Sequence, residues 1–85
     1  MRHANERDLD RLGALLDELR SLGGLRERKR GNFQIGSRAF LHFHAHGDEF
    51  FADCRTDDTD FVRYPVTNSR QRAAFVRVVR THLAK

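Results

Sequence analysis

Three histidines at alternate positions, His42, His44 and His46, form the pattern in this sequence that most strongly indicates chemistry. On a β-strand, alternate side chains leave the same face about 6.8 Å apart. Two imidazoles at that separation can reach one divalent transition metal ion with bonds of about 2.1 Å. The spacing therefore allows two alternative metal sites, one that adds Asp53 to the first two histidines and one that adds Glu49 to the last two.

The segment around these histidines is predicted to be a β-hairpin. A Gly-Asp pair between two alternating runs is typical of a two-residue turn, and it places His42 opposite Asp53 and His44 opposite Phe51. The apolar side chains of both strands then share the core face. The other face is a candidate interaction face formed by Phe40, His42, His44, Phe51 and Asp53. The simpler interpretation is a half-exposed sheet face on which histidines and carboxylates are cross-strand partners.

The rest of the chain predicts one helix before the strands and one after them. Asn5 with Asp8 is a capping box that begins a first helix, and leucines recur at three- and four-residue spacing as far as Leu22. Asn68 with Gln71 begins a second helix, running to about residue 83. Strands are expected over about 25–35, 38–46, 49–55 and 61–66. The predicted fold is α+β, a four-stranded antiparallel meander in the order α-β-β-β-β-α with two helices on one face.

The turn after Ile35 leaves the register of the first strand open. A two-residue loop would place Phe33 and Ile35 on the histidine face. A loop one residue longer would place them on the core face, opposite Leu41 and Ala39. Because a one-residue slip moves a whole apolar set into water, we expect the longer loop.

The formal net charge of +4 is unevenly distributed. Residues 48–60 are acidic, whereas residues 25–38 and 61–85 are basic. One alternative function is weak, non-specific binding of nucleic acid. Its basic patch would consist of Arg26, Arg28, Lys29, Arg30, Arg70, Arg72, Arg77 and Arg80. We favour a simpler interpretation of the first group, an exposed sheet edge where positive charges discourage association with another edge.

Length and composition predict one small domain over residues 1–85. No stretch approaches about 20 consecutive apolar residues, and the first residues lack the apolar core of a signal peptide. We therefore expect a cytoplasmic protein with no membrane partner. The single cysteine, Cys54, excludes an internal disulfide and a CxxC metal site, and we expect it to be buried on the core face.

Three stretches of the chain resemble the small bacterial proteins named luciferase-family or luciferase-domain proteins: IGSRAFLHFHAHGDEFFADCR, VRYPVT and the closing amphipathic helix. The resemblance covers about residues 31–83. Longer members carry a further histidine and a P-D-S-G-W-like stretch that this sequence lacks. The resemblance implies a fold more than an activity, and no flavin or oxygen site is visible.

These patterns predict a small non-enzymatic interaction module that forms a homodimer or binds a protein through the candidate interaction face. Exposed aromatic rings among ionisable groups are typical of contact surfaces. The alternative from a different class is a metal-dependent activity at His42, His44 and Asp53. No catalytic residue or cofactor is predicted for the interaction module, whereas the alternative requires a divalent transition metal.

Overall fold

The computed structural model describes all 85 residues, Met1–Lys85, and has an α+β fold. Its elements are β1 (Arg2–His3), α1 (Glu6–Arg11), α2 (Gly13–Arg20), β2 (Arg26–Lys29), β3 (Asn32–Ile35), β4 (Arg38–His46), β5 (Glu49–Cys54), β6 (Val62–Pro65) and α3 (Ser69–Leu83). The strands form one antiparallel sheet in the order β2-β3-β4-β5-β6, and β1 also pairs with β4. The α+β class and the antiparallel meander are therefore confirmed.

The sheet has more strands than the four predicted, for two reasons. The expected first strand is folded into a hairpin of β2 and β3, because Gly31, at φ 80°, lets the chain reverse there. A side chain at this position would also meet Leu9, 2.7 Å away. The beginning of the chain, where no strand is predicted, forms β1, in which Arg2 pairs with Ala45 and His3 with His44.

The leucine-rich segment forms two helices rather than the one predicted. The capping box of Asn5 and Asp8 begins α1 as expected, but Leu12 interrupts the helix at φ −93° and ψ 9°. Gly13, a poor residue for a helix interior, follows at the break. The leucines on both sides of the interruption are still buried on one side of the two helices. The buried leucines are Leu9, Leu12, Leu15, Leu16 and Leu19.

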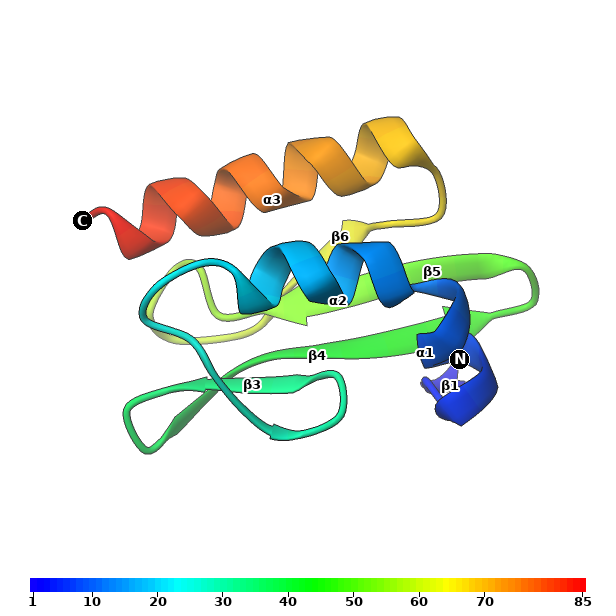
Figure 1. Cartoon of the computed structure of the whole chain (residues 1–85), viewed down its shortest axis with the longest axis horizontal. Coiled ribbons are helices and arrows are strands. Elements are labelled where there is room, and N and C mark those ends of the chain that lie inside the picture. Colours follow the sequence, from blue (N-terminus) through cyan, green and yellow to red (C-terminus); the bar gives the residue numbers. More distant parts are fainter.

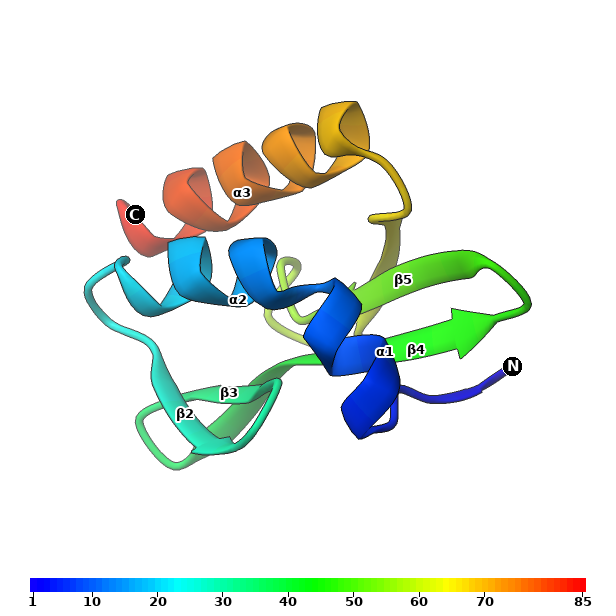
Figure 2. The same ribbon diagram turned by 45° about the vertical axis from the view of Figure 1, so that its right-hand side comes forward.

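The helices α2 and α3 lie side by side on one face of the sheet (Figures 1 and 2), which confirms that part of the prediction. The capping box of Asn68 and Gln71 begins α3 as expected. One hydrophobic core fills the space between helices and sheet, and it includes Cys54. Burial raises the pKa of this thiol to about 12, so it is inert as a nucleophile. None of the helices has the length and apolar character needed to cross a membrane.

The loop between β3 and β4 has two residues, because Ile35 pairs with Arg38. The predicted pair of Ile35 with Ala39 is therefore wrong. The register then shifts by one residue, so that Phe33 pairs with Leu41, as predicted. Both alternatives for this loop are thus partly right. The two-residue loop is right for the pairing next to the turn, and the register of the longer loop is right for Phe33, which pairs with Leu41.

The register shift leaves Phe40 as an extra residue in β4, which is a β-bulge. A bulge breaks the alternation of faces, and Phe40 and Leu41 are accordingly both buried. Phe40 is only 3% exposed, and its ring lies 5.1 Å from the ring of His82 on α3. The prediction that Phe40 belongs to the exposed interaction face is therefore wrong.

Candidate metal centre

The hairpin of β4 and β5 has the predicted register, with His42 opposite Asp53 and His44 opposite Phe51. The carboxylate Oδ2 of Asp53 lies 3.1 Å from Nδ1 of His44 and 3.6 Å from Nε2 of His42. One ligand atom from each of the three residues lies within 4.8 Å of the others. The alternative set with His46 does not come together as a group of three donors.

These separations are close to those of ligands around a single ion. With bonds of about 2.1 Å, two ligands of a tetrahedral zinc ion lie about 3.4 Å apart. The two distances from Asp53 Oδ2, 3.1 and 3.6 Å, fall on either side of that value. The ligand nitrogens of the two imidazoles lie no more than 4.8 Å apart.

Asp53 is held in place by Arg63 of the neighbouring strand β6. The guanidinium donates from Nε to Oδ1 at 2.7 Å and from a terminal nitrogen to Oδ2 at 2.8 Å. These bonds hold the pKa of the Asp53 carboxyl below its ordinary value, so the group is ionised at neutral pH. A carboxylate oxygen can accept about two hydrogen bonds or ligand contacts. Arg63 therefore leaves a position free on Oδ2, the oxygen that both histidines approach.

The two histidines are uncharged at neutral pH. Burial lowers the pKa of His42 and of His44 below the ordinary value of 6.5, and the charge of Asp53 opposes this shift only in part. Nδ1 of His44 is buried and makes no hydrogen bond, although it lies 3.1 Å from Oδ2 of Asp53. Two neutral imidazoles and a carboxylate form a donor set that suits transition metal ions better than magnesium or calcium.

Three residues of this site were missed from the sequence. The ring of His3 lies 4.5 Å from that of His44, Phe61 packs edge-on against His42 at 4.7 Å, and Arg63 holds the carboxylate. Alternation along β6 could have indicated Arg63, because the neighbouring Tyr64 packs against the core. The sequence argues against His3 at this site, because no strand is predicted over the first residues of the chain.

The predicted interaction face is only partly assembled. Phe51 is half-buried on the same face as His42, His44 and Asp53, but Phe40 has turned into the core. This face carries none of the helices (Figures 1 and 2). The surface that an interaction module would use therefore lacks one of the two phenylalanines predicted for it.

The residues of the predicted basic patch do not gather on one surface. β2 and β6 are opposite edges of the sheet, and α3 packs against β6. Arg30 is paired with Glu6 and Asp10 of α1, and Arg72 donates to backbone carbonyls before α3. The other members are exposed: Arg26, Arg28, Lys29, Arg70, Arg77 and Arg80. β2 is an edge strand, as the simpler interpretation of its charges requires.

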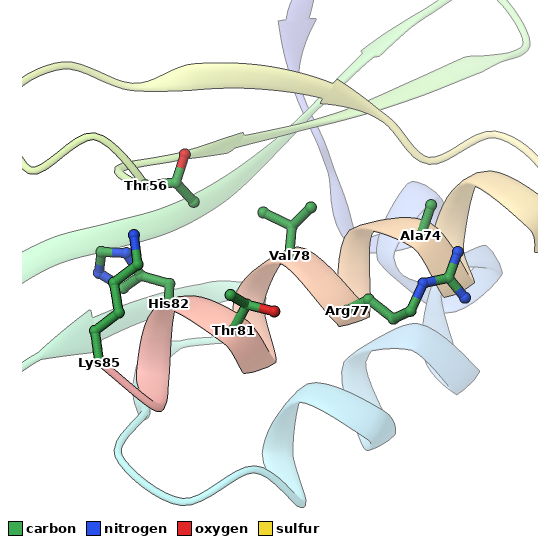
Figure 3. Close-up of a pocket in the computed structure, with 7 residues that line it drawn as sticks. All are labelled: Thr56, Ala74, Arg77, Val78, Thr81, His82 and Lys85. Carbon is green, nitrogen blue, oxygen red and sulfur yellow. The ribbon is translucent and has the colours of Figure 1, made fainter.

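A depression beside α3 lies away from this centre (Figure 3). Side chains of α3, among them Arg77 and His82, line it together with Thr56 from the loop after β5. The nearest carboxylate to His82 is that of Asp58, whose Oδ1 lies 3.7 Å from the imidazole Nε2. No second histidine or cysteine lines this depression, so its residues do not form a metal-ligand set.

Comparison with known proteins identifies no relative of this chain. No family model matches it, and neither a curated protein nor a solved structure does. The resemblance to luciferase-family proteins therefore stays a prediction. The function has to be inferred from the residues themselves.

The free energy of unfolding is expected to decrease when the pH is lowered from about 7.5 to about 5. Since His42 and His44 have a lower pKa in the folded chain than in the unfolded chain, the unfolded chain binds more protons in this range. Urea denaturation with a chelator present measures the effect. His44→Asn should flatten the pH profile. A wild-type profile that is flat over this range would contradict the expectation.

Proposed function

We propose that this protein is a small binding domain for one divalent transition metal ion, held between His42, His44 and Asp53. The observation that carries the proposal is the buried Nδ1 of His44. It lies 3.1 Å from a carboxylate oxygen that also faces a second imidazole, yet it has no hydrogen bond. Zinc fits best, because it accepts imidazole and carboxylate ligands at the small coordination number that this site can supply.

The unsatisfied atoms of the cluster support a cation at this point. A buried imidazole nitrogen without a hydrogen-bond partner is unfavourable. Burial also lowers the pKa of His44 and so disfavours the protonated, charged ring. A metal ion between Nδ1 of His44, Nε2 of His42 and Oδ2 of Asp53 would satisfy all three atoms.

The proposal is for binding rather than for catalysis. His42 is 23% and His44 13% exposed at the side chain, so the site is reachable from solvent. Three protein ligands leave a coordination position open on a tetrahedral ion. A metal-dependent activity would use that position for a substrate, and it depends on the same three residues.

Isothermal titration of tag-free, chelator-treated protein with zinc and with nickel tests the proposal. We expect one equivalent to bind with a dissociation constant below about 100 µM, a free energy better than about −5.5 kcal/mol. Binding should weaken below about pH 6.5, because protons compete for the imidazoles. Asp53→Asn should weaken binding at every pH. Uptake of less than about a tenth of an equivalent of either metal would overturn the proposal.

Self-association through the open sheet face is a second candidate function. It is supported by two half-buried rings, Phe51 and Phe61, on the face that carries no helix. Sedimentation with a chelator present should then show a dimer that the Phe51→Ser, Phe61→Ser double variant loses. A wild type that stays monomeric at high concentration would remove this candidate while leaving the metal proposal in place.

A further inference from the structure

β1 brings a third imidazole to the edge of the candidate metal centre. His3 is the direct partner of His44 in the β1–β4 pairing, and residues directly opposite on neighbouring strands place their side chains on the same face. Its ring lies 4.5 Å from that of His44 and 5.9 Å from that of His42. Because His3 is exposed, its imidazole has room to rotate toward the two rings.

Few interactions hold β1 against the sheet. Only Arg2 and His3 pair with β4, and the amide of Ala4 donates to the carbonyl of Phe43 at 3.0 Å. The Arg2 guanidinium pairs with Asp8, a residue of the capping box of α1. Arg2 is 54% exposed at the side chain, and ion pairs at such exposed positions contribute little to stability. A further contact at His3 would therefore change the stability of β1 appreciably.

We propose that His3 is a fourth ligand of the ion bound by His42, His44 and Asp53, and that the metal thereby locks β1 onto β4. This inference rests on the proposed metal-binding function. Three imidazoles and one carboxylate complete the four positions of a tetrahedral zinc site. The two equilibria are linked. If pairing of β1 with β4 raises the metal affinity by some factor, bound metal favours the paired state of β1 by the same factor.

The test compares wild type, His3→Ala and His46→Ala, all without a tag or added residues before Met1. His46 is an exposed histidine of the same sheet and serves as the matched control. His3→Ala should weaken zinc binding about 10–100-fold without abolishing it, and His46→Ala should leave it unchanged. The second readout is hydrogen exchange at the Ala4 amide. Zinc should slow this exchange about tenfold or more in wild type and leave it unchanged in His3→Ala.

The outcomes separate this inference from the function on which it rests. If zinc binds wild type and His3→Ala equally well and Ala4 exchanges at the same rate with and without zinc, His3 is not a ligand. In that result the three-residue site still stands. If zinc does not bind wild type at all, the metal-binding function fails, and the role of His3 fails with it.

Discussion

The Phe40→Ala variant is expected to unfold with about 3–5 kcal/mol less free energy than wild type, whereas Phe51→Ala should lose less than about 1.5 kcal/mol. The bulge in β4 turns Phe40 into the core, where it packs against His82 and is 3% exposed. Phe51 remains half-buried on the open face. Two phenylalanines that the sequence places on one surface therefore differ in energetic role. Urea denaturation of both variants measures the difference.

A domain of this size has a free energy of unfolding of only about 5–10 kcal/mol, so Phe40→Ala can fail to fold. Phe40→Leu keeps most of the buried volume and should lose about 1–1.5 kcal/mol while remaining measurable. Equal and small losses for Phe40→Ala and Phe51→Ala would show that Phe40 lies at the surface. The bulge would then be wrong.

His44→Ala is expected to lower zinc affinity by more than about 100-fold, since even residues that only orient a ligand contribute about 10–100-fold. His44 supplies the buried Nδ1 on which the metal site depends. His46→Ala should change the affinity less than about twofold, because His46 is exposed and outside the three-donor group. Competition against a coloured zinc chelator measures both constants.

Comparing His44→Ala with His46→Ala distinguishes a specific metal site from non-specific binding of metal to exposed histidines. Losses of equal size in His44→Ala and His46→Ala would mean that zinc binds the histidines without regard to their geometry. Circular dichroism of both variants confirms that the fold is retained. His44 lies on the face of the sheet that carries no helix, so the substitution should leave the helices unchanged.

The central hairpin could be predicted from the sequence because its signals are local. A Gly-Asp pair defines the turn, and strict alternation on both sides allows only one register that buries the apolar residues. That register brings His42 opposite Asp53, as the structure shows. The capping boxes at Asn5 and Asn68 are equally local, and both helices begin where these boxes predict.

The features that could not be predicted depend on contacts between distant segments. The bulge at Phe40 reconciles a two-residue turn at one end of the hairpin with a buried Phe33 at the other. β1 is too short for any periodic pattern, and its partner β4 is distant from it in the chain. Predicting the bidentate bond from Arg63 to Asp53 requires the register between β5 and β6. The sequence of the acidic loop that joins these strands does not determine that register.

Nuclear magnetic resonance of the imidazole nitrogens identifies the atoms that bind the metal most directly. Zinc should shift the resonances of Nε2 of His42 and Nδ1 of His44, the atoms that face Asp53 Oδ2, and should leave His46 and His82 unchanged. Shifts at His46 or His82 comparable with those at His42 and His44, or no shift at any histidine at saturating zinc, would contradict a metal site between His42, His44 and Asp53.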